Sequence, residues 1–211
     1  MPRRNRVDPF GDLHAVPDRG LFTGNRGCLV DDHGQMARHH RGDLWITCVT
    51  EYRNWRHQVD APGTWTPIFF LDDAVALAAG HRPCGLCRRP EYHAYREAVT
   101  RTGAESSPDA ARLNRLLATE RLRRGRGLDR AADRITWTAT LEVLPRGTII
   151  LDPGRKPLLV IDDRLMSFTF SGWVDPRPRP HGGSVEVLTP PTSVAAMRHG
   201  FEPVLHPSAT V

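Results

Sequence analysis

Short apolar runs separated by polar turns predict strands in the first part of the chain. Residues 44–50 and 65–70 are rich in β-branched and aromatic side chains, a composition typical of strands. The second run leads into an alanine-rich segment that Asp72 or Asp73 can cap and that Gly80 can end. We therefore expect a strand followed directly by a helix of one to two turns.

The middle of the chain carries helical patterns. A proline start and an acidic first turn predict a helix over residues 90–99. Ser107-Pro108-Asp109 opens a second helix, which ends in the basic, glycine-rich run 121–127. Its apolar stripe consists of Leu113, Leu116, Leu117 and Leu122.

From Ile135 onward the spacing of apolar and polar residues changes to the one typical of strands. Apolar runs are separated by Pro, Gly and Asp, which is the pattern of a β-meander or small barrel. These runs are 136–143, 147–151, 158–161 and 165–170. The segment 192–199 predicts a last short helix, so the expected fold class is α+β.

Composition and charge narrow the functional classes. The chain has 211 residues, 39% of them apolar, which is enough for one sizeable core or two small ones. No apolar run approaches the roughly 20 residues that cross a bilayer, and residues 1–6 lack the apolar region of a secretory signal. We therefore expect a cytoplasmic protein without a membrane partner. Its net charge of +5 favours an anionic partner, and Lys156 is the only lysine among many arginines.

Four cysteines supply the candidate chemistry. Cys84 and Cys87 form a Cys-x-x-Cys pair, which can bind one tetrahedral metal ion from a tight turn. A structural zinc site needs four ligands, so two more must come from distant sequence. Cys28, in a glycine-rich loop, and Cys48, in the strand over 44–50, are the remaining thiols, and we predict that they complete the zinc site. The reserve ligands are the histidines His33, His57 and His81.

Other uses of this spacing fit the sequence less well. A zinc nucleobase deaminase needs His-x-Glu or Cys-x-Glu upstream of the pair, yet neither His57 nor Cys48 has a glutamate two residues after it. A redox pair lies at the N-terminus of a long helix, whereas Cys84 follows a helix end. A catalytic zinc bound by Cys48, Cys84 and Cys87, with Glu51 as the base, stays open as an alternative.

Residues 69–88 combine an aromatic pair, an alanine-rich helix, Gly80, and then His81-Arg82-Pro83-Cys84-Gly85-Leu86-Cys87-Arg88. In this combination the segment resembles the N-terminal metal-binding domain of the Ada DNA-repair protein family, with His81 in an aromatic position. The resemblance implies a zinc scaffold and a surface that binds DNA. In that family the other two ligands form a Cys-x-x-x-Cys pair, whose spacing falls here on Arg53 and His57.

Arg53 cannot bind zinc, and in the Ada family the thiolate that accepts a methyl group comes from that first pair. The resemblance therefore does not extend to suicidal methyl transfer. His57 at the second position leaves a Cys₃His site open beside a Cys₄ site.

Arginines around the Cys-x-x-Cys pair predict contacts with the phosphate groups of nucleic acid. The candidates are Arg53, Arg56, Arg82, Arg88 and Arg89. We therefore expect a zinc-binding protein that binds DNA or another nucleic acid, while the sequence leaves open whether it is also an enzyme. The alternatives are a hydrolase-like zinc enzyme with a pocket between the two halves and a zinc-stapled protein-interaction module. The sequence identifies neither a small-molecule substrate nor an oligomeric state.

The predicted organisation has four parts. An extended polar arm covers residues 1–20 and an Ada-like zinc-binding module covers 21–100. A helical basic connector covers 101–134, and a β-rich domain covers 135–211.

Overall fold

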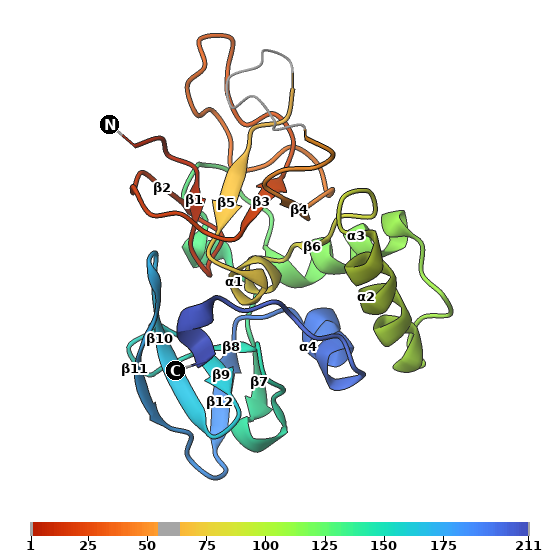
Figure 1. The fold of residues 1–211 in the computed structure, drawn as a ribbon, viewed down its shortest axis with the longest axis vertical. Coiled ribbons are helices and arrows are strands. Elements are labelled where there is room, and N and C mark those ends of the chain that lie inside the picture. The colour runs from red at the N-terminus through yellow and green to blue at the C-terminus, as the bar shows by residue number, and fades with distance from the viewer. Residues whose placement is uncertain (1, 55–63, 211) are drawn as a thin grey trace.

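Two six-stranded sheets lie on either side of a short buried helix, α1, in the computed structural model (Figure 1). The structure describes residues 2–54 and 64–210. The first sheet comes from the N-terminal half of the chain and the second from the C-terminal half. Together with the helices they make an α+β fold, as the sequence predicts.

The first sheet has the strand order β2-β1-β5-β3-β4-β6. Its strands are β1 (Arg6–Val7), β2 (Leu13–His14), β3 (Phe22–Asn25), β4 (Ile46–Val49), β5 (Ile68–Phe70) and β6 (Arg82–Pro83). The pairs β1–β5 and β4–β6 are parallel, and the other pairs are antiparallel. The prediction of an extended arm is wrong for β1 and β2, because Val7 and Leu13 anchor these strands in the core with 1% and 3% of their surface exposed.

The second sheet is antiparallel throughout and has the order β11-β10-β9-β8-β12-β7. Its strands are β7 (Trp137–Thr140), β8 (Ile149–Leu151), β9 (Pro157–Ile161), β10 (Arg164–Thr169), β11 (Gly172–Pro178) and β12 (Ser184–Val187). Strands β8 to β11 form the predicted meander, and β12 returns to pair between β8 and β7.

Helix α1 (Asp73–Ala78) joins the cores of the two sheets. Asp72 caps it by accepting a hydrogen bond from the Val75 amide at 3.1 Å, which confirms the predicted start. All six of its residues are buried, as expected for a helix that is apolar on nearly every side. One hydrophobic cluster includes α1 together with residues of β5, β8 and β9. The predicted boundary at residue 134 therefore does not separate two independent cores.

Three longer helices pack beside the sheets: α2 (Arg89–Arg101), α3 (Ala110–Arg121) and α4 (Pro191–Arg198) (Figure 1). Asp109 caps α3 by accepting from the Arg112 amide at 2.7 Å. Helices α2 and α3 both contact α4, and the hydroxyls of Tyr95 and Ser193 hydrogen-bond at 2.9 Å. The predicted connector is therefore part of the packed molecule. Short 3₁₀ turns cover Ala131–Asp133, Leu141–Val143 and Pro207–Thr210.

No helix in the two described ranges is long and apolar enough to cross a membrane.

Candidate metal centre

Three cysteines from separate parts of the first sheet meet at one point. The sulfur atoms of Cys48, Cys84 and Cys87 all lie within 4.8 Å of one another. In a tetrahedral zinc site with Zn–S bonds of about 2.3 Å, two sulfur atoms are about 3.8 Å apart. The group therefore has the dimensions of a zinc-thiolate site, and it is the one cluster of three or more such ligands in the described residues.

The parallel pairing of β4 with β6 brings the cysteines together. Thr47 lies opposite Pro83, and the Cys84 amide donates to the Thr47 carbonyl at 2.9 Å. Cys84 therefore follows β6 at the level where Cys48 follows Thr47 in β4. A tight turn, in which the Arg88 amide donates to the Cys84 carbonyl at 3.1 Å, then returns Cys87 to the same place.

Hydrogen bonds around the sulfur atoms favour thiolate at Cys84. The Leu86 amide donates to Cys84 Sγ at 3.4 Å. Hydrogen bonds with Cys48 and Cys87 lower the pKa of Cys84, and the bond to Cys84 raises the pKa of Cys48. A bound zinc ion would take all three groups as thiolates, so its binding would release protons.

Arg82 and Arg88 support this cluster from inside the protein. Arg88 is 2% exposed and forms a two-pronged ion pair with Asp73, with N–O distances of 2.6 and 2.8 Å. Its Nη1 also donates to the Thr47 hydroxyl at 3.2 Å. Arg82 is 3% exposed and donates to Asn114 Oδ1 at 2.9 Å. The prediction that these two arginines bind phosphate is wrong, because burial and these partners keep their guanidinium groups inside.

The other predicted nucleic-acid contacts differ in their placement. Arg89 and Arg53 are exposed, and Arg53 lies over the ring of Tyr52 at 5.2 Å. Arg56 lies outside the described residues. Two of the five predicted arginines therefore stay available on the described surface.

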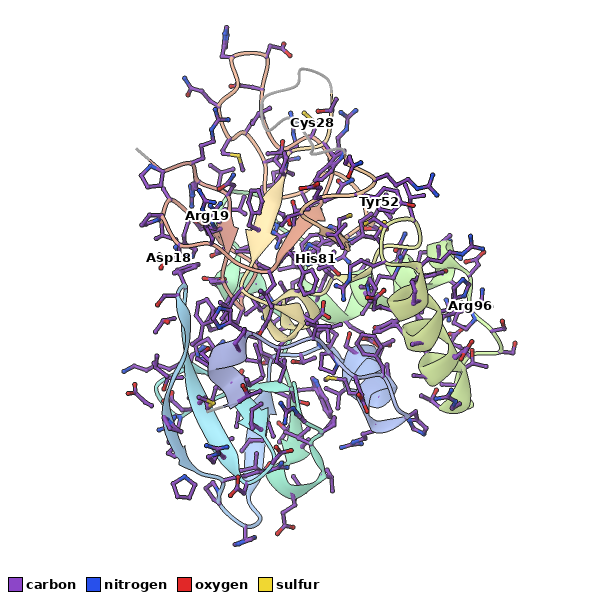
Figure 2. The ribbon with its side chains drawn as sticks, in the orientation of Figure 1. Asp18, Arg19, Cys28, Tyr52, His81 and Arg96 are labelled. Atoms are coloured by element: carbon purple, nitrogen blue, oxygen red, sulfur yellow. The ribbon has the colours of Figure 1, made fainter. Side chains whose placement is uncertain are left out.

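Cys28 does not belong to the cluster, which corrects the predicted Cys₄ set. In the antiparallel pairing of β3 with β4, Thr23 lies opposite Cys48 and Asn25 opposite Ile46. Cys28 comes three residues after Asn25, beyond the Ile46 end of β4, whereas Cys48 lies toward the Val49 end. The Cys28 sulfur hydrogen-bonds the Val30 carbonyl at 3.6 Å, in a loop at the outer end of the molecule (Figure 2).

The reserve histidines are also apart from the three sulfur atoms. His33 lies in an exposed turn. His81 is fully buried near α1 (Figure 2), where its Nε2 accepts from Arg26 Nε at 3.1 Å and its ring packs on Trp45. His57 lies outside the described residues. The structure thus removes His33 and His81 from the ligand set.

Substituting Cys28→Ser is expected to leave metal binding unchanged. The reason is that the Cys28 sulfur bonds a loop carbonyl and lies apart from the other three sulfurs. Metal content by mass spectrometry and the thermal unfolding midpoint should match those of the unmodified protein. A loss of bound metal in this variant would contradict the three-cysteine assignment.

Three thiolates in a fixed geometry are ligands for a borderline-soft divalent ion such as zinc. Among the described residues no fourth His, Cys, Asp or Glu completes the group. Comparison with known proteins adds no assignment: no protein-family model, curated protein or solved structure matches this chain.

Proposed function

We propose that this protein binds one zinc ion through Cys48, Cys84 and Cys87, and that the metal is structural. The observation that carries the proposal is the convergence of the three sulfur atoms. The metal fixes the end of β4 against the turn that begins α2, in the manner of the Ada-like scaffold that residues 69–88 resemble. Exposed arginines on this scaffold bind nucleic acid.

The charge balance around the sulfurs supports the metal. A zinc ion with three thiolates carries a net charge of roughly −1. In the described part of the chain Arg82 has no carboxylate partner. Burial lowers its pKa, and Tyr92, Tyr95 and then Cys84 and Cys48 act in the opposite direction. A buried cation beside the site is the counter-charge that a zinc tris-thiolate needs.

The nucleic-acid part of the proposal rests on the surface charge. The chain carries a net charge of +5, and Arg89 lies exposed directly after the Cys-x-x-Cys turn. Guanidinium groups bind phosphate oxygens in a two-pronged geometry. Arg89 and Arg53 are therefore the described contacts that replace the five-arginine set.

The salt dependence of oligonucleotide binding tests this surface. We expect a labelled DNA duplex to bind at low salt, with affinity that falls as salt rises. Arg89→Ala should reduce the slope of log affinity against log salt by about 1. Arg146→Ala is the matched control and should leave the slope unchanged, because Arg146 is an exposed arginine in the turn before β8 that pairs with Asp162. Absence of binding at low salt, or equal slopes for all proteins, would refute the nucleic-acid proposal.

A catalytic zinc is the second candidate, because the described residues supply three ligands, as many as the protein gives in catalytic sites. Cobalt substitution separates the two functions. A tetrahedral spectrum that azide does not alter indicates a closed structural site, and one that azide shifts indicates an open site. The same spectrum recorded on His57→Ala tests the Cys₃His alternative.

A further inference from the structure

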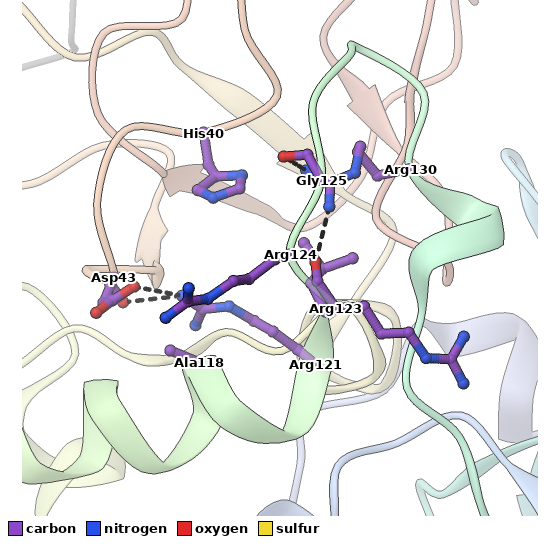
Figure 3. A pocket seen from close by; sticks show the side chains of 9 residues that line it. His40, Asp43, Ala118, Arg121, Arg123, Arg124, Gly125 and Arg130 are labelled. Atoms are coloured by element: carbon purple, nitrogen blue, oxygen red, sulfur yellow. Dashed lines mark hydrogen bonds and ion pairs between the residues drawn. The ribbon is translucent and has the colours of Figure 1, made fainter.

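A basic pocket lies at the end of α3, away from the three cysteines. It has a volume of about 310 Å³, within the range of small-ligand sites. The C-terminal turn of α3, the loop that follows it and the segment with His40 and Asp43 enclose it (Figure 3). Four arginines line it, Arg121, Arg123, Arg124 and Arg130, against the single carboxylate of Asp43.

Two of these arginines are buried, and one of them lacks a close carboxylate partner. Arg121 and Arg130 are 2% and 3% exposed. Arg130 pairs with Asp133, but Arg121 is 3.8 Å from the nearest carboxylate oxygen, that of Asp43. Arg121 donates hydrogen bonds to the neutral carbonyls of Gly80 at 3.3 Å and Asp43 at 3.2 Å. Its guanidinium also lies over the Trp45 ring at 3.9 Å, so an aromatic face and neutral carbonyls, rather than a close carboxylate, surround its charge.

Arg124 adds a second positive charge at the same place. Figure 3 shows its side chain beside that of Arg121, reaching toward Asp43 below His40. Within the described residues Arg124 forms no hydrogen bond or ion pair. Guanidinium groups that line one pocket repel each other unless an anion lies between or against them.

Two glycines leave room for the side chains of the buried arginines. Gly80 has φ of +87°, and a Cβ there would lie 2.7 Å from Arg121 Cδ. A Cβ on Gly125 would lie 2.7 Å from Arg130 Nη2. A larger residue at either glycine would collide with the arginine, so both glycines leave the space that the two side chains occupy.

We propose that this pocket binds a phosphate group, with Arg121 and Arg124 as the main contacts. The planar guanidinium fork matches phosphate oxygens. Arg121 is buried and already held in place, whereas Arg124 is exposed and can close on the bound anion. The phosphate comes either from a free phosphate or nucleotide or from the backbone of a nucleic acid. The site is separate from the zinc centre and does not depend on the nucleic-acid proposal.

Calorimetric titration with inorganic phosphate at constant ionic strength tests the pocket. We expect saturable binding, weakened about tenfold or more in Arg124→Ala because a charge-assisted contact is lost. Arg126→Ala is the matched control, since Arg126 is exposed in the same loop but does not line the pocket. It should change the affinity less than twofold, and circular dichroism should show both variants folded.

Absence of phosphate binding by the unmodified protein, or equal weakening by both variants, would overturn the proposal. A competition experiment between phosphate and an oligonucleotide identifies which molecule supplies the bound phosphate group. Displacement of a bound oligonucleotide by phosphate, lost in Arg124→Ala, supports backbone phosphate as the ligand. Phosphate and nucleotide binding that an oligonucleotide does not affect supports a small ligand, and it leaves the pocket assigned even if nucleic-acid binding fails.

Discussion

Cys84→Ser is expected to empty the metal site and to cause a large loss of stability. Cys84 is the most buried of the three cysteines. Its sulfur forms hydrogen bonds with both other thiols and with the Leu86 amide. A serine oxygen is a poor zinc ligand, so two thiolates would remain. Zinc that binds the folded state contributes about 4 kcal/mol when it is present at a thousand times its dissociation constant.

Metal content and thermal unfolding measure this effect together. The unmodified protein should contain about one zinc ion per chain, and the variant almost none. A chelator should lower the unfolding midpoint of the unmodified protein and of Cys28→Ser, but not that of Cys84→Ser. Full metal content and an unchanged midpoint in Cys84→Ser would exclude a structural zinc at this site.

Asp73→Asn is expected to destabilise the fold by about 3–5 kcal/mol, the cost of leaving one member of a buried ion pair alone. Asp73 is 2% exposed and balances Arg88, which is equally buried. The amide has nearly the same shape, so the loss comes from charge and hydrogen bonding. This is a large part of the about 5–15 kcal/mol that stabilises an ordinary domain.

Urea unfolding of three variants checks the assignment. Asp162→Asn removes the exposed partner of Arg146 and should change the midpoint little. Adding Arg88→Met to Asp73→Asn should recover part of the stability, because the unpaired charge is then gone. A shift for Asp73→Asn no larger than that for Asp162→Asn would show that the buried pair does not stabilise the fold.

Local sequence signals predicted the helices and six of the strands, but not β3, β11 or β12. Helix α1 begins at its Asp72 cap and ends just before Gly80, because both signals act within a few residues. Strands β1 and β2 gave no such signal, since each has two residues and its stability comes from burial of Val7 and Leu13. Tertiary packing, rather than propensity, decides strands of this length.

The candidate site, too, could be predicted only where the signal is local. The spacing of Cys84 and Cys87 is local and predicts their shared turn. The choice between Cys48 and Cys28 depends on how β3, β4 and β6 pair, which no local pattern encodes. Arg88 looked like a surface residue because most arginines are exposed. Its buried partner, Asp73, lies on another element and becomes visible only in the fold.

The first turn of α1 depends on the last residues of the chain. Asp73 accepts a hydrogen bond from the Val204 amide at 3.0 Å, and Asp72 accepts from the His206 amide at 3.0 Å and from the Trp173 indole at 2.7 Å. On the ribosome these two carboxylates therefore lack the Val204 and His206 amides until more than 130 further residues have been synthesised. The N-terminal half completes its polar core only after the C-terminal half has left the exit tunnel, so the two halves finish folding together.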